Sequence, residues 1–172
     1  SIGIERQSLK NGKKRKLIEE LTKLPDLVKK ALLKEEEIKK AAEKIANYSD
    51  VLFMGRGTLF PIALEGALKL KEISYIHSEG YASGELKHGP IALVDEHLAI
   101  ITFAPFDHLF EKSLSNLQEV LARNGKVILI TNETGKKSAN KEVQQTITMP
   151  SYDSIFSQII YAIPAQLLAD NV

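Results

Sequence analysis

The sequence has no cysteine among its 172 residues. This absence excludes disulfides, thiolate metal sites and a Cys nucleophile within the chain. The four histidines are scattered along the sequence and share no ligand spacing, so the residues predict neither a metal site nor a bound cofactor. Any chemistry carried by this chain must therefore do without thiols.

Long apolar runs and a strong excess of one charge are also missing. No run approaches the roughly 20 apolar residues that cross a membrane, and no signal peptide is visible. The formal net charge of +1 argues against a nucleic-acid binder. We therefore expect a soluble cytoplasmic protein with no membrane or nucleic-acid partner. Since the chain begins at Ser1 and no cap or glycine closes its last helical pattern, we also expect the natural polypeptide to run further.

The charge that is present divides the chain into a head and a body. Residues 1–50 hold 13 Lys and Arg against 9 Asp and Glu, and the remainder holds 10 against 13. The division predicts linker and amphipathic helices in residues 1–48 and one compact domain in residues 49–172. The basic run KNGKKRK (residues 10–16) is interpreted as a solvated linker in preference to a contact with an anionic surface.

Apolar residues in the head recur at helical spacing. The segments that show this pattern are residues 17–24, 27–32 and 38–45. Pro25 is expected to end or restart the first helix, because proline lacks the backbone N–H that would continue it. Two or three amphipathic helices result, and their apolar stripes need cover from the following domain or from a neighbour.

The body alternates between apolar runs of strand length and helical patterns. Strand-like runs occupy residues 51–55, 91–94, 98–104, 126–131 and 145–149, and helical patterns occupy residues 62–76, 110–121 and 153–172. Of the two neighbouring runs, 98–104 is the better strand. The alternation is typical of a three-layer α/β domain with four or five mostly parallel strands. Polar residues alternate with apolar ones in 145–149, which predicts an edge strand.

Two further segments carry predictions of their own. The polar stretch 132–142 is expected to be a surface loop or a short helix. The pattern in 153–172 is apolar on most sides, so this helix should be buried between the sheet and another element, or against a second subunit. Pro164 should kink it by removing one backbone hydrogen bond.

Parallel sheets of this kind bind ligands at the carboxyl ends of their strands, near the first turn from strand to helix. Here that turn consists of Gly55, Arg56, Gly57 and Thr58. Its glycines would let the backbone approach a phosphate, the following helix N-terminus would favour an anion, and Arg56 would add charge. An ordinary tight turn explains the same glycines equally well, and both interpretations stay open.

A charged stripe in the helical pattern of residues 62–76 is the main candidate for chemistry. Glu65, Lys69 and Glu72 fall within about 60° of one another on a helix. The remaining faces are apolar, so we expect a mostly buried helix whose stripe is directed at water, a partner subunit or a substrate. As a solvated pair, Glu65 and Lys69 would contribute about 0.2 to 0.5 kcal/mol. In a cleft, a carboxylate beside a lysine can instead be tuned as a proton-transfer base.

His88 would complement such a base. It lies in ELKHGP, a stretch too short and too glycine-flanked to be core, so a site role and an exposed loop position are equally supported. A carboxylate with a nearby imidazole suits enolisation of a sugar, because the carboxylate moves a proton between adjacent carbons while the imidazole handles a hydroxyl or ring oxygen. The other histidines show no partner pattern and are expected to be structural or exposed: His77, His97 and His108.

A resemblance to a known family rests on the stretch ALEGALKLKEISYIHSEGYASGELKHGPIALVD, residues 63–95. It is similar to the second sugar-isomerase (SIS) half of the isomerase domain of the glutamine:fructose-6-phosphate aminotransferases. The likeness extends from Leu17 through LFMGRG and NGKVILIT to IPAQLLAD, and so covers nearly the whole chain. It implies a flavodoxin-like SIS domain with a five-stranded parallel sheet. It also implies an enzyme that makes glucosamine 6-phosphate from fructose 6-phosphate and glutamine-derived ammonia, with an isomerisation after amination.

The resemblance also assigns roles to the candidate residues. Glu72 would be the base that moves a proton between C1 and C2 of the sugar, with Lys69 and Glu65 tuning and positioning it. His88 would assist ring opening in the active site of the neighbouring subunit. A homodimer is therefore implied as the functional unit.

Three parts of the family's enzyme have no counterpart in this sequence. They are the glutaminase domain, the first SIS half with its Ser/Thr-rich loop for the sugar phosphate, and the carboxyl-terminal tail with its imine-forming lysine. Residues 55–58 would then be a vestigial counterpart of the phosphate loop, and we expect the chain alone to be inactive. Two alternatives stay open: a non-catalytic SIS module that senses a sugar phosphate, and a related SIS deglycase or isomerase acting on another phosphorylated sugar.

Overall fold

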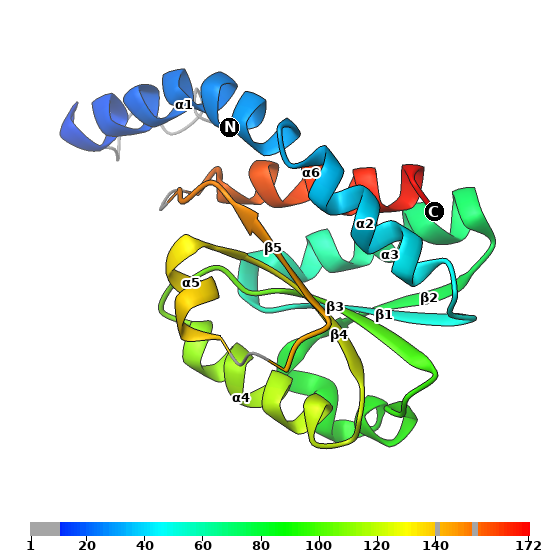
Figure 1. Cartoon of the computed structure of the whole chain (residues 1–172). Helices are drawn as coiled ribbons and strands as arrows, with labels where there is room; N and C mark the ends of the chain where they lie inside the picture. Colours follow the sequence, from blue (N-terminus) through cyan, green and yellow to red (C-terminus); the bar gives the residue numbers. More distant parts are fainter. Residues whose placement is uncertain (1–10, 140–141, 153–154) are drawn as a thin grey trace.

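The computed structural model describes residues 11–139, 142–152 and 155–172. Five parallel strands form one sheet in the order β2-β1-β3-β4-β5, and helices cover both of its faces (Figure 1). The predicted three-layer α/β architecture with a five-stranded sheet is confirmed. Among the described residues, no helix is both long enough and apolar enough to cross a bilayer. Residue 10 of the basic run lies outside the described residues, and residues 11–16 begin the helix α1 (Asn11–Leu32), so the interpretation of this run as a linker is wrong.

Strands and helices alternate along the body of the chain, as the sequence predicts, apart from the corrections given below. The strands are β1 (Asp50–Gly55), β2 (His77–Ala82), β3 (Leu98–Phe103), β4 (Lys126–Asn132) and β5 (Gln145–Met149). The α-helices are α1 (Asn11–Leu32), α2 (Glu35–Ile45), α3 (Phe60–Ser74), α4 (Phe110–Leu121), α5 (Glu133–Ser138) and α6 (Ser157–Asp170). The described residues also contain three short 3₁₀ helices: η1 (Gly57–Leu59), η2 (Ser83–His88) and η3 (Pro90–Leu93).

The central strands are apolar throughout because both faces of the sheet are covered. Successive side chains point to opposite faces, so Phe53 and Ile101 belong to the core under α1, α2, α3 and α6. Met54 and Ile100 belong to the second core, under α4 and η2. α6 lies between α1, α2 and α3 on the first face, as Figure 1 shows, and its burial against other elements agrees with the prediction.

Three predictions about the elements need correction. Residues 77–82 form edge strand β2, which the sequence did not reveal because HSEGYA contains no apolar run. Residues 91–94 are not a strand; most of them belong to η3, which starts at Pro90. α1 continues through Pro25 without interruption. This proline is exposed, so water can bond the carbonyl that it leaves free.

Other predictions are confirmed. β5 is an edge strand of the sheet, and the stretch after β4 contains the short helix α5. α6 spans Pro164 as one continuous helix, and the predicted kink stays a prediction.

Candidate functional site

Helix α3 carries the predicted charged stripe. It follows β1 through the single turn of η1 and has a proline in its first turn. Tyr75 caps its carboxyl end, and a φ of 62° places this residue in the left-handed region. Its inner side packs closely on the sheet: a Cβ at Gly66 would meet the ring of Phe53, and a Cβ at Gly80 of β2 would meet the α3 backbone. This close packing fixes which side of α3 faces away from the sheet.

The stripe is held by an ion pair between its last two members. Lys69 Nζ donates to Glu72 Oε2 at 2.8 Å. This hydrogen bond is the main reason that the pKa of Lys69 is raised, and the charges of Glu72, Glu65 and Asp170 add to the effect. The predicted pairing of Lys69 with Glu65 is therefore replaced by the pair with Glu72. Asp170, at the end of α6, is a neighbour that sequence spacing did not reveal.

The side of α3 that bears the stripe is open to solvent. Glu72 is 52% exposed, and Glu65 and Lys69 are half-buried. The flanking apolar residues Leu64, Leu68 and Ile73 are 45%, 45% and 46% exposed. The prediction of a mostly buried helix is thus wrong on this side, and only the opposite side is core. We call this surface the open face of α3, made of Leu64, Glu65, Leu68, Lys69, Glu72 and Ile73.

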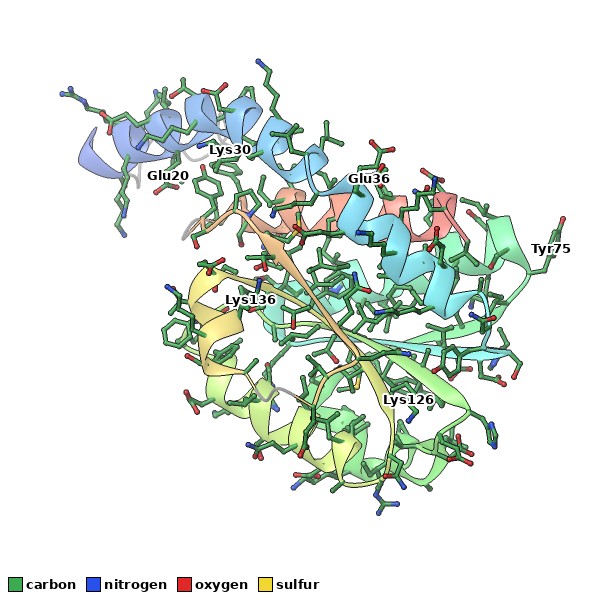
Figure 2. The ribbon with its side chains drawn as sticks, in the orientation of Figure 1. Glu20, Lys30, Glu36, Tyr75, Lys126 and Lys136 are labelled. Carbon is green, nitrogen blue, oxygen red and sulfur yellow. The ribbon has the colours of Figure 1, made fainter. Side chains whose placement is uncertain are left out.

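Tyr75 extends the apolar character of this region. It is 91% exposed and projects away from the body of the molecule at the end of α3, as Figure 2 shows. An apolar border around charged side chains differs from an ordinary solvated helix surface, where apolar residues stand singly.

His88 lies in a separate segment, η2, that contacts α4. η2 is fixed to α4 by an ion pair of 2.8 Å between Lys87 and Glu119, and the Asn116 side chain donates to the Ser83 carbonyl. His88 itself is 73% exposed, with Nδ1 at 3.9 Å from Glu85. Within the described part of the chain, no hydrogen bond or ion pair joins His88 to the stripe. The structure therefore does not assemble the predicted base and imidazole into one site.

The turn Gly55-Arg56-Gly57-Thr58 has clear local reasons for its glycines. A Cβ at Gly55 would overlap the backbone of Leu59, and Gly57 has a φ of 58°. The Arg56 guanidinium lies against Gly84 of η2, and its Nε is buried without a hydrogen-bond partner among the described residues. These observations favour the tight-turn interpretation, with Arg56 directed toward the segment that carries His88.

A cavity of about 680 Å³ lies at the carboxyl edge of the sheet, where the fold predicts a ligand. Its walls come from the first half of α1, the ends of β1, β3, β4 and β5, and the first turn of α6. Thr58 lines it, as does His108, but the stripe and His88 do not. Sequence reasoning missed this cavity because its lining comes from segments far apart in the chain.

No group of three or more potential ligand side chains that could hold a metal ion occurs within the described ranges. His77 has a structural role: its Nδ1 lies 2.8 Å from Asp50 Oδ1 at the start of β1. Hydrogen bonds from Ser49 and then His77 lower the pKa of Asp50. His97 is exposed, as expected.

The sequence matches the SIS domain family over residues 44–171. It is 53% identical over 169 residues to a glutamine–fructose-6-phosphate aminotransferase (isomerizing) of Bradyrhizobium diazoefficiens, covering 98% of this chain and 28% of that protein. The corresponding protein of Agrobacterium fabrum is 49% identical over 170 residues, with the same two coverages. The C-terminal domain of the glucosamine-fructose-6-phosphate aminotransferase from Francisella tularensis superposes with a TM-score of 0.91 at 44% identity, covering 95% of this chain and 46% of that one. The chain thus spans little more than a quarter of the length of the curated relatives.

Proposed function

Because the chain belongs to the SIS domain family, we propose that it is the second SIS half of the isomerase domain of a glutamine–fructose-6-phosphate aminotransferase. The complete enzyme would make glucosamine 6-phosphate from fructose 6-phosphate and glutamine. The observation that carries this proposal is the open face of α3, where a Lys-Glu pair stands in an exposed apolar border. The high identity to aminotransferases favours this function over a sensing module or a deglycase.

Glu72 would act as the proton-transfer base. Its carboxylate would take a proton from C1 of the aminated sugar and deliver it to C2, so that the carboxylate is regenerated and the sugar is isomerised. Lys69 Nζ, at 2.8 Å, would hold the carboxylate in place. Glu65 and Asp170 would in turn keep Lys69 protonated, in agreement with its raised pKa.

The occupant of the open face would be the first SIS half of the same parent chain. The Francisella tularensis domain is more than twice as long as the part that this chain covers, which leaves room for a second domain of similar size. Docking would bury Leu64, Leu68 and Ile73 and remove water from around Glu72. Loss of water strengthens the interaction between Glu72 and Lys69.

His88 would serve the neighbouring subunit of a homodimer. Its segment is tied to α4 by the ion pair between Lys87 and Glu119, and the imidazole is 73% exposed with Glu85 at 3.9 Å from its Nδ1. An exposed imidazole with only a distant carboxylate beside it is suited to act as an acid or base on a sugar bound elsewhere.

Glu72→Gln in the complete enzyme tests the proposal, because it removes the proton acceptor and preserves the shape of the side chain. We expect the rate of glucosamine 6-phosphate formation to fall about 10²- to 10⁴-fold, with glutamine hydrolysis nearly unchanged. Lys71→Gln, an exposed neighbour outside the stripe, is the matched control and should retain both activities. Equal loss of the two activities in Glu72→Gln would contradict the proposal and indicate a folding role.

A further inference from the structure

The segment η2 is attached to α4 on one of its sides. Its Leu86 side chain is fully buried, and Lys87 forms an ion pair of 2.8 Å with Glu119. The Asn116 side chain donates a hydrogen bond to the Ser83 carbonyl. These contacts hold one side of η2, and none of them involves the turn that follows β1.

Arg56 supports η2 from a second side. β1 and β2 pair in register, with Gly55 opposite Ala82. Arg56 and Ser83 are therefore the first residues beyond the two paired strands. A Cβ at Gly84 would lie 3.2 Å from Nη2 of Arg56, so the guanidinium rests against the backbone of η2. The end of β1 and the start of η2 are thus in contact through this side chain.

Stability alone does not account for an arginine at this position. The Nε of Arg56 is buried and has no hydrogen-bond partner among the described residues. The hydroxyl of Ser83, at the same level of the sheet, is also buried without a partner in the described ranges. A buried donor without a partner destabilises a folded chain, and more so when it belongs to a cation. An apolar side chain of similar length would favour folding more, so the contact with η2 calls for a functional explanation.

The backbone that carries Arg56 is fixed relative to α3. A Cβ at Gly55 would overlap the backbone of Leu59, and Gly57 has a φ of 58°. Both positions need glycine, and the turn between β1 and α3 is correspondingly tight. A side chain that leaves this turn and rests on η2 therefore sets the position of η2 relative to α3, the helix that bears Glu72.

We infer that Arg56 is a positioning residue for His88. Its guanidinium holds η2 in the place from which the imidazole reaches the sugar, and this inference rests on the proposed function. Opening of a furanose ring breaks the bond between C2 and the ring oxygen. The C2 hydroxyl loses a proton as the carbonyl forms, the ring oxygen gains one, and the imidazole carries this proton. Arg56 acts on that step through His88.

The test compares two substrates of the complete enzyme, fructose 6-phosphate and 5-deoxyfructose 6-phosphate. The second lacks the oxygen that closes the furanose ring, so its reaction does not need ring opening. Arg56→Met should lower kcat for fructose 6-phosphate about 10- to 100-fold, because a displacement of about 1 Å at a catalytic group has an effect of this size. With the 5-deoxy sugar, kcat relative to the unaltered enzyme should change less than about twofold. Arg123→Met replaces an exposed arginine after α4, and this matched control should leave both rates unchanged.

Three further variants show whether the effect passes through His88. His88→Ala should produce the same selective loss, and adding Arg56→Met to it should reduce kcat no further. Gly84→Ala adds a Cβ 3.2 Å from the guanidinium and should cause a smaller loss of the same kind, about two- to fivefold. Glutamine hydrolysis should stay unchanged in Arg56→Met, and its thermal midpoint should stay equal or rise, because an unpartnered buried donor is removed.

The outcomes separate this inference from the proposed function. Equal loss with both substrates in Arg56→Met, or no loss with either, beside a selective loss in His88→Ala, would overturn the inference and leave the proposed function intact. Any result other than a selective loss in His88→Ala would overturn the role proposed for His88 and the inference with it. Glu72→Gln should lose synthesis from both substrates, and it tests the rest of the proposed function independently.

Discussion

The open face of α3 and the cavity at the carboxyl edge differ in how complete they are. The open face carries the motif-like residues Glu65, Lys69 and Glu72, but its apolar border is exposed to water. The cavity has walls from both ends of the chain and contains a buried hydroxyl, yet it holds none of the residues that the sequence singled out as catalytic. In the proposed function a partner completes the open face, whereas the described residues of this chain form the walls of the cavity.

The difference shows that the sheet topology and the charged stripe predict functional sites in two different parts of the molecule. The rule for parallel sheets predicts a ligand at the carboxyl ends of the strands, and the cavity lies there. The charged stripe lies on the side of α3 that faces away from the sheet, where the rule for parallel sheets predicts no ligand. Exposed apolar residues that lie together mark interaction surfaces, and the exposed leucines beside the stripe therefore support the proposed docking of a second domain.

The largest effect is expected when a charged residue is introduced on the open face of α3, because this change tests whether a partner covers that face. Leu68→Asp should cost the 172-residue chain no more than about 2 kcal/mol of stability, because Leu68 is already 45% exposed there. In the complete enzyme the same change would bury an unpaired carboxylate, and synthesis of glucosamine 6-phosphate should fall at least about 100-fold. Chemical denaturation of the chain and activity of the enzyme measure the two effects.

Leu33→Asp is the matched control for this substitution. Leu33 lies between α1 and α2 and is more exposed than Leu68, so a carboxylate there should be tolerated in both the chain and the complete enzyme. Full activity of the enzyme with Leu68→Asp would mean that no partner covers the open face.

A smaller effect is expected from mixing two inactive variants of the complete enzyme. Glu72→Gln and His88→Ala should each lose synthesis when alone. If His88 serves the neighbouring subunit, a mixed dimer retains one site with both residues intact, and a random mixture recovers about a quarter of the activity. Activity after co-expression, or after subunit exchange, measures this recovery. No recovery, with mixed dimers demonstrated by two affinity tags, would place His88 in its own subunit's site.

Much of the architecture could be predicted because both faces of the sheet are covered. Central strands such as β3 and β4 are then apolar throughout and easily recognised. β2 was not predicted because an edge strand needs fewer apolar residues. Its buried Ser78 hydroxyl donates a hydrogen bond to the Ala67 carbonyl, so a polar residue is tolerated there. Residues 91–94 were mistaken for a strand because periodicity alone cannot separate a short apolar run from a buried helical turn.

The candidate site could be predicted only in part. The stripe follows from helical spacing, and the structure confirms that Lys69 and Glu72 meet. The exposure of Leu64 and Leu68 could not be predicted, since a leucine covered by a partner domain and a leucine in the chain's own core have the same sequence pattern. The cavity forms only because the fold brings Tyr161 and Thr58 together, and no local sequence pattern predicts that these two residues are neighbours.

The smallest expected effect is the change in stability of the ligand-free chain when the hydroxyl of Tyr161 is removed. Burial, with a contribution from Asp107, raises the pKa of Tyr161 above its ordinary value. A raised pKa in the folded state means that stability is fully present below the unfolded value of about 10 and is lost as pH rises beyond it. At neutral pH, Tyr161→Phe should stabilise the ligand-free chain by about 1 kcal/mol, because it removes a buried hydroxyl that has no hydrogen-bond partner among the described residues.

The same variant should also reduce the loss of stability above pH of about 10. Thermal midpoints of the wild-type chain and of Tyr161→Phe, measured from neutral pH to about pH 11, should diverge as pH rises. Tyr75→Phe removes a hydroxyl that is exposed in the folded chain and should follow the wild type. If Tyr161→Phe instead lowers the midpoint at neutral pH, the hydroxyl already has a partner within the chain, and the cavity then has no unmet donor to offer a ligand.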